Sequence, residues 1–127
     1  MLANSDFTRG LLLDLGVEQN RIAVVAGGVD AARFQRPDVH KAAWRSALGL
    51  PADAFVLLTA CRFVAKKGLD LVLHALQALR SDLPAHLVVV SDGRDRPIYQ
   101  ALAAEPELSR HVTFPGHIKH GLIEHYF

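Results

Sequence analysis

The chain has 127 residues, of which half are apolar and 21% are charged, as is usual for one soluble globular domain. Its formal net charge is +1, so its overall charge favours neither nucleic acid nor an anionic membrane as a partner, and any anion site must be local. Its one cysteine, Cys61, excludes an internal disulfide and suits a reducing cytoplasm. No apolar segment approaches the roughly 20 residues of a membrane span.

The N-terminal segment predicts a strand, a helix and a second strand. "MLANS" is typical of the end of a strand, and Ser5 is placed to cap a helix over residues 6–15 that ends at Gly16. The apolar run of residues 21–30 predicts a short second strand.

Glycines and a linker follow that strand. At Gly27 and Gly28 the backbone can take positive φ. Residues 33–38 predict a linker, and Asp38 is placed to cap a helix over residues 44–48, which a glycine ends.

The regular part of the chain alternates strands and helices. Continuous apolar runs predict buried strands at residues 54–60, 86–91 and 111–114. Helical spacing predicts a helix over residues 69–80, and Pro97 suits the first turn of another. The order βαβαβ predicts an α/β fold, a Rossmann-like parallel half-domain with right-handed crossovers, preceded by the N-terminal β-α-β segment.

Both ends of the chain look cut. "MLANS" opens inside a strand, and Ile123, Tyr126 and Phe127 are still in helical phase where the chain stops. We therefore expect a piece of a larger protein. The alternative is a remnant that cannot fold because its last helix exposes Tyr126 and Phe127.

Three cations and a glycine follow the first long strand: Arg62, Lys66, Lys67 and Gly68. Open α/β sheets bind ligands at the carboxyl ends of their strands, where a helix N-terminus also offers free N–H groups and partial positive charge. Arg62 and Lys67 predict a site for a diphosphate there, and Gly68 leaves room for a phosphate. Lys66 is expected to point away, and solvated surface is the alternative for all three cations.

The second strand end carries a tight turn, "SDGRD". Asp92 is a candidate to accept a hydrogen bond from a ribose or sugar hydroxyl. An ordinary Asp-Gly turn pair with Gly93 is an equal alternative.

Other chemistries receive little support. The spacing of His111, His117, His120 and His125 can be made to resemble a metal site, but no cysteine or helical His-x-x-x-His pair accompanies it, so we expect no metal. Cys61 has no paired base that would make it a nucleophile. The dinucleotide glycines, the Walker loop and the GxSxG elbow are absent, which disfavours an epimerase on the same fold.

Taken together, five segments have a familiar order and spacing. They are "ANSDFTRGLLLDLGV", "RIAVVAGGVDAARF", "CRFVAKKGLDLVLHAL", "LVVVSDGRDR" and "HVTFPGHI". With these, nearly the whole chain resembles the family-four, group 1 glycosyltransferases of GT-B fold. The resemblance implies a retaining, metal-independent enzyme without a cofactor that transfers a sugar from a nucleotide diphosphate donor.

The resemblance also implies roles for particular residues. Arg62 and Lys67 match the cations that grip the donor diphosphate and stabilise the leaving group, so both are catalytic candidates. Gly28 falls in the loop between the two domains, and the segment after the third strand holds the nucleotide base. The donor-binding candidates besides the two cations are Gly28, Gly68, Asp92, Gly93, Gly116, His117 and Ile118.

By the same resemblance, residues 1–30 end the acceptor-side domain, residues 31–53 form an interdomain linker and helix, and residues 54–127 begin the donor-binding domain. The expected donor is a UDP-, GDP- or ADP-sugar, and the acceptor is an unknown sugar or lipid-linked compound, with no nucleic acid involved. The parent protein is expected in the cytoplasm, where peripheral contact with the membrane face stays open. We expect the fragment alone to be inactive, because the family's glutamate pair and most of its acceptor domain are missing.

Three residues depart from the family's pattern. Gly27 replaces an asparagine, and Cys61 and Ser91 each replace a glycine. Because each lies in a loop that faces the donor, these departures favour the rival hypothesis of a non-catalytic nucleotide-binding or interaction module on the same fold.

Overall fold

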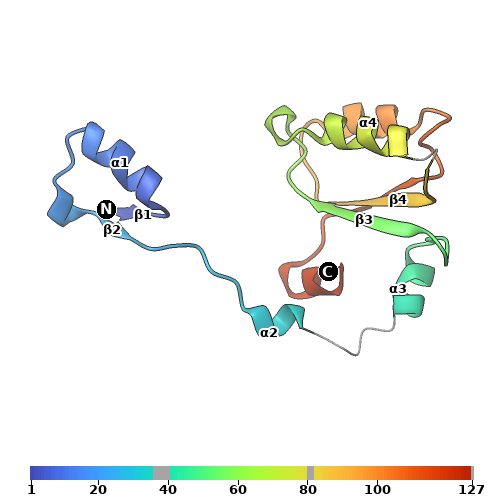
Figure 1. Ribbon diagram of the computed structural model, residues 1–127, viewed down its shortest axis with the longest axis horizontal. Helices are drawn as coiled ribbons and strands as arrows, with labels where there is room; N and C mark the ends of the chain where they lie inside the picture. The colour runs from blue at the N-terminus through green and yellow to red at the C-terminus, as the bar shows by residue number, and fades with distance from the viewer. Residues whose placement is uncertain (36–40, 80–81, 127) are drawn as a thin grey trace. The chain divides into compact units, whose positions relative to one another are not determined.

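The computed structural model describes residues 1–35, 41–79 and 82–126 (Figure 1). The chain divides into two compact units, residues 1–35 and residues 36–127. Each unit has its own parallel sheet.

The first unit contains the expected β-α-β segment. Its elements are β1 (Leu2–Ala3), α1 (Asp6–Asp14), the 3-10 turn η1 (Gln19–Arg21), β2 (Ala23–Val24) and a short helix α2 (Ala31–Phe34). β1 and β2 pair in parallel, as expected for two strands joined by a helix.

Local signals determine both ends of α1, as predicted. The Ser5 hydroxyl accepts a hydrogen bond from the backbone N–H of Thr8 at 3.2 Å, and Gly16 follows the helix with φ of 84°. Gly27 and Gly28 do not use the positive φ that glycine permits. Residues 25–30 form no turn, so no left-handed residue is needed there.

The second unit contains a three-stranded parallel sheet in the order β3-β4-β5, which confirms the predicted βαβαβ arrangement. Asp38, the expected cap of its first helix, lies outside the described residues. The elements are α3 (Lys41–Ala47), β3 (Phe55–Ala60), the 3-10 turn η2 (Ala65–Lys67), α4 (Leu69–Leu79), β4 (Ala85–Val90), α5 (Arg96–Ala103), β5 (Val112–Gly116) and the 3-10 segment η3 (His120–Tyr126).

Both faces of this sheet are covered, which explains why β4 is apolar and buried along its whole length. α4 and α5 pack on one face, around Leu87 and Val89, and α3 and η3 lie on the other, around Val88 and Val90 (Figure 1).

The last described segment packs against the second unit, whereas the alternative of a remnant that cannot fold placed Tyr126 on the surface. Tyr126 is half-buried and lies edge-on to Trp44, with ring centroids 5.3 Å apart. Ile123 packs in the same cluster, because a spacing of three residues places both side chains on one face of a 3-10 turn. Phe127 lies outside the described residues.

One histidine is buried in the central strand. His86 lies within hydrogen-bonding distance of Thr113, with 2.9 Å between Nε2 and Oγ1. Burial and, to a smaller extent, the nearby His111 lower the pKa of His86, so the ring is neutral in the folded core at neutral pH.

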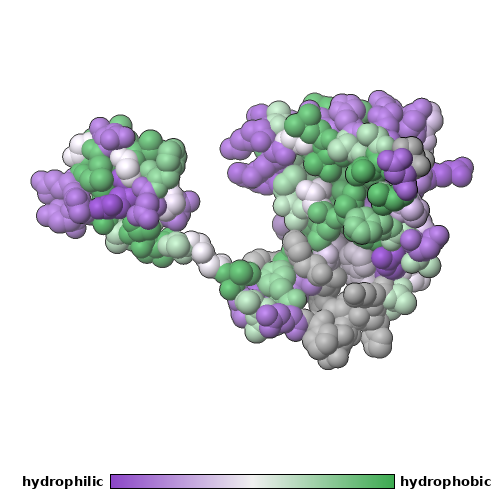
Figure 2. All heavy atoms as spheres, viewed as in Figure 1, coloured by the Kyte–Doolittle hydropathy of each residue, from purple (hydrophilic) through white to green (hydrophobic). Residues whose placement is uncertain are grey.

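The outer surface of the second unit is mixed. In Figure 2 hydrophilic side chains cover the rim above α4, and hydrophobic residues gather over the layer between this helix and the sheet. In the described ranges, no helix has both the length and the apolar character that crossing a bilayer requires.

Candidate functional site

The carboxyl ends of β3, β4 and β5 lie at one edge of the sheet, because the three strands are parallel. Three segments leave this edge: residues 61–68, residues 91–95 and the segment after Gly116. Most of the predicted site residues of the second unit fall in these segments.

A first pocket of about 270 Å³ lies at the strand ends. Its lining brings together residues from all three segments, including the predicted Arg62, His117 and Ile118. The remaining lining residues are Ala60, Cys61, Val90, Ser91 and Ile123. Two of the residues that depart from the family's pattern, Cys61 and Ser91, therefore line the same pocket as Arg62.

A second pocket of about 460 Å³ shares Arg62 with the first and is otherwise lined by Val64, Ala65, Lys66 and Arg94. Lys66, which was expected to point away, is exposed and lines this second pocket. Lys67 lines neither pocket and is solvent-exposed at the end of η2. Gly68 ends η2 in a left-handed conformation, with φ of 65° and ψ of 32°, and α4 begins at the next residue.

The two loops that form this edge are locked together through Phe63. The N–H of Phe63 donates to the carbonyl of Asp92 at 3.1 Å, and the N–H of Asp95 donates to the carbonyl of Phe63 at 3.2 Å. The Asp95 carboxylate also accepts from the N–H of Ala65 at 3.0 Å. Three hydrogen bonds therefore hold the backbone between Arg62 and Lys66 against the second loop.

Gly93 permits this close approach. A Cβ at position 93 would lie 2.5 Å from the carbonyl oxygen of Phe63 and 2.7 Å from its nitrogen. The structure shows a packing role for Gly93, and its expected contact with the donor stays a prediction.

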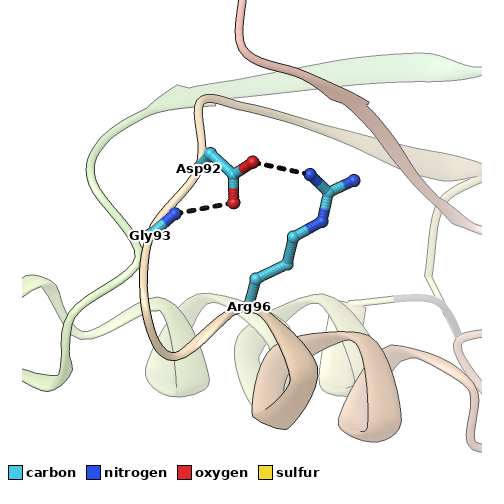
Figure 3. A network of polar contacts seen from close by, with 3 residues as sticks. All are labelled: Asp92, Gly93 and Arg96. Carbon is cyan, nitrogen blue, oxygen red and sulfur yellow. Dashed lines mark hydrogen bonds and ion pairs between the residues drawn. The ribbon is translucent and has the colours of Figure 1, made fainter.

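Asp92 makes polar contacts within its own turn (Figure 3). Oδ1 accepts from the N–H of Gly93 at 2.8 Å, and Oδ2 accepts from Nη1 of Arg96 at 2.8 Å. The Gly93 N–H, followed by the Arg96 guanidinium and by His117, lowers the pKa of this carboxyl below its usual range. These contacts account for Asp92 as a turn residue; a bond to a ribose or sugar hydroxyl stays a prediction.

Ser91 has an unusual backbone conformation in the first pocket. Its φ is 115°, and among the described residues it is the one non-glycine with positive φ. Its N–H donates to the carbonyl of Gly116 at 3.0 Å, and Gly116 itself has φ of 86°. The ends of β4 and β5 thus impose on Ser91 a geometry that glycine adopts more easily.

We therefore expect Ser91→Gly to raise the free energy of unfolding by about 1 kcal/mol, because the relieved strain exceeds the entropy that glycine adds to the unfolded chain. Ser91→Ala is the matched control, since it removes the hydroxyl but keeps the Cβ. Urea unfolding of both variants checks this. Equal free energies of unfolding for Ser91→Gly and Ser91→Ala would show that the positive φ of Ser91 is not strained.

The other predicted residues are placed as follows. Gly116 ends β5 and is buried beside the first pocket. Gly28 belongs to the first unit, so its relation to this edge is still only an expectation. Among the described residues no three His, Cys, Asp or Glu side chains are grouped to hold a metal ion.

Sequence reasoning did not find Arg94 or Ile123 as pocket residues. Arg94 follows an Asp-Gly turn at a strand end, a position that could have suggested it. The contribution of Ile123 depends on η3 folding back over the sheet, for which the sequence has no local signal.

A parallel sheet covered on both faces, with cations at its carboxyl edge, defines a nucleotide-binding type of α/β domain. Residues 40–127 match the family model "Glycosyl transferases group 1". This match covers more than half of the chain, and the chain therefore belongs to the group 1 glycosyl transferases.

The chain is similar to two bacterial enzymes named D-inositol 3-phosphate glycosyltransferase. It is 41% identical to the enzyme of Kineococcus radiotolerans over 85 residues, covering 66% of this chain and 19% of the relative. It is 35% identical to that of Jonesia denitrificans over 125 residues, covering 90% of this chain and 30% of the relative. The chain thus spans less than a third of these relatives.

Solved structures confirm the fold as part of a GT-B glycosyltransferase. A glycosyltransferase of Rickettsia africae superposes with a TM-score of 0.80 at 19% identity, covering 98% of this chain and 35% of that one. Anabaena HepE, crystallised with UDP, superposes with a TM-score of 0.78 at 19% identity, covering 97% and 34%.

Proposed function

We propose that this chain forms the first half of the donor-binding domain of a retaining, metal-independent hexosyltransferase that uses a nucleotide diphosphate sugar. The single observation that carries the proposal is Arg62, which lines both pockets at the carboxyl edge of the sheet. Complexes of HepE with UDP and with UDP-glucose support a donor of this kind.

The first pocket has the chemistry to hold a nucleoside. Its lining is mainly apolar, from Val90, Ile118 and Ile123, and His117 adds a polar ring at its rim. A base needs flat apolar contacts and a few polar groups, and a pocket of this composition supplies both. We propose that Gly116, His117 and Ile118 contact the nucleotide base. Gly28, in the first unit, is proposed as a further donor contact.

Charge stabilisation is the chemistry that the cations supply. When the sugar leaves, negative charge grows on the departing diphosphate, and Arg62 can stabilise it with two parallel hydrogen bonds. Lys67 is the second cation in this proposal, with Gly68 beside it. Because these cations stabilise the negative charge of the leaving diphosphate, the proposed reaction needs no metal ion or other cofactor.

The acceptor belongs to the part of the protein that this chain does not cover. The similar enzymes carry the name D-inositol 3-phosphate glycosyltransferase, and a phosphorylated or lipid-linked polyol or sugar is our proposed acceptor class. The single half-buried Cys61 fits a cytoplasmic reaction, with peripheral membrane contact left to the rest of the protein.

Arg62→Ala should weaken nucleoside diphosphate binding by about 1.5 kcal/mol or more, roughly tenfold, because a charged hydrogen bond is lost at an exposed site. Calorimetric titration of the chain with UDP, GDP and ADP measures this and identifies the base. Arg110→Ala is the matched control, because Arg110 is an exposed arginine just before β5, at the opposite edge of the sheet.

Unchanged affinity in Arg62→Ala would refute the assignment of this cation. Binding of UDP that gains nothing from an attached glucose would favour the rival function, a non-catalytic nucleotide-binding module. Cys61 and Ser91 in the first pocket are the observation on which that alternative depends.

A further inference from the structure

The second pocket, lined by Arg62, Val64, Ala65, Lys66 and Arg94, is here called the cationic pocket. Its walls are two small apolar residues, and its charged groups come from two different loops. Three cations and one nearby carboxylate, Asp95, leave a net of two positive charges around about 460 Å³. That excess equals the charge of a phosphate dianion.

The cations of the cationic pocket are available to a ligand. Arg94 bonds Asp95 through Nε, at 3.3 Å from Oδ1, and its side chain is 80% exposed. Over the described ranges, Arg62 and Lys66 make no hydrogen bond or ion pair through their side chains. Both oxygens of Asp95 are already engaged, one by Arg94 and one by the N–H of Ala65. The carboxylate therefore does not neutralise Arg62 or Lys66.

The loops that carry these cations are held before any ligand arrives. The hydrogen bonds of Phe63 to Asp92 and Asp95, and of Ala65 to Asp95, join the two loops. The absent side chain of Gly93 allows the contact. Cations on a preorganised backbone lose less entropy when they close on an anion than cations on a free loop.

We propose that the cationic pocket binds a phosphate or diphosphate group, with Lys66 and Arg94 as contact residues beside Arg62. This inference deepens the proposed function, because it names phosphate contacts that the family resemblance did not assign. It also separates two adjacent lysines: Lys66 lines the pocket and Lys67 does not. The group is either the diphosphate of the donor or a phosphate on the acceptor, which share the same chemistry.

Calorimetric titration of the chain with inorganic pyrophosphate at low ionic strength tests the site directly. We expect Lys66→Ala and Arg94→Ala each to weaken binding about fivefold, the upper range for an exposed ion pair, and the double variant to weaken it more than tenfold. Arg110→Ala has the same change of charge far from the pocket and should leave the affinity unchanged. Circular dichroism of each variant shows whether it is folded.

The outcomes separate this inference from the proposed function. The inference is overturned if the wild-type chain does not bind pyrophosphate, if the double variant binds as tightly as wild type, or if Arg110→Ala weakens binding equally. UDP binding that depends on Arg62, together with pyrophosphate binding that depends on neither Lys66 nor Arg94, would support the proposed function and overturn this inference. Pyrophosphate binding that depends on Arg62, Lys66 and Arg94, without binding of any nucleotide, would support the cationic pocket and contradict the proposed function.

Competition identifies the source of the phosphate. If the donor diphosphate occupies the cationic pocket, UDP displaces pyrophosphate and the two never bind together. If the pocket serves an acceptor phosphate, inorganic phosphate binds to the UDP complex with unchanged affinity, and Lys66→Ala weakens only phosphate.

Discussion

Phe63→Ala is expected to lower the free energy of unfolding of the second unit by about 3–5 kcal/mol, the usual cost of removing a buried aromatic side chain. The Phe63 side chain is fully buried. Its ring lies edge-on to Tyr99 and Phe114, with centroids 6.0 and 5.9 Å away. A cavity at this position loses both aromatic contacts, and thermal or urea unfolding measures the loss.

A matched control is available in the neighbouring strand. Phe55 is 60% exposed in β3, so Phe55→Ala should change stability by well under 1 kcal/mol. If Phe63→Ala does not fold, Phe63→Leu keeps most of the volume and should show a smaller loss in the same direction. Similar losses in Phe55→Ala and Phe63→Ala would show that Phe63 is not the anchor of this loop.

Phe63 also connects stability to the site, because it lies between Arg62 and Lys66 in the chain. Its backbone holds the second loop through Asp92 and Asp95. At temperatures where Phe63→Leu is fully folded, we expect its pyrophosphate affinity to fall as well, since the cations are less firmly positioned.

Gly93→Ala is expected to lower the free energy of unfolding by about 2–3 kcal/mol, because an added methyl group would overlap the backbone of Phe63. The nearest atoms, at 2.5–2.9 Å, belong to the main chain and cannot rotate away. The loops must then move apart, which lengthens the hydrogen bonds between them. Urea unfolding checks the stability.

Gly121→Ala provides the comparison within the same unit. No atom lies within 4 Å of a Cβ at position 121, and the residue does not have positive φ. Its stability should therefore equal that of the wild type or exceed it slightly. Equal effects of the two substitutions would mean that the loss at Gly93 does not come from contact with Phe63.

Much of the fold could be predicted because its signals are local. Ser5 and Gly16 define the ends of α1, and the apolar runs of β3, β4 and β5 mark buried parallel strands. Each of these signals acts over a few residues, through a cap, a left-handed glycine or a repeat of apolar positions. The order of the elements then restricts the sheet to a few topologies.

The site was predicted less completely, because its shape depends on contacts between loops about 30 residues apart. The sequence placed cations at the end of β3, and Arg62 does line both pockets. It did not predict that Lys66 lines a pocket and Lys67 does not, because the 3-10 turn η2 determines which of two adjacent lysines lies beside the cavity. A shift of one residue in such a turn rotates a side chain by about a third of a turn.

By itself, then, the sequence of this protein determined the kinds of element, their order and the edge of the sheet where a ligand would bind. The tertiary structure decided what happens at that edge. Gly93 lies against Phe63, and Ser91 is forced into positive φ by its bond to Gly116. Each is a contact between segments that only folding brings together, so its geometry follows from the packing of the whole second unit and not from any local pattern.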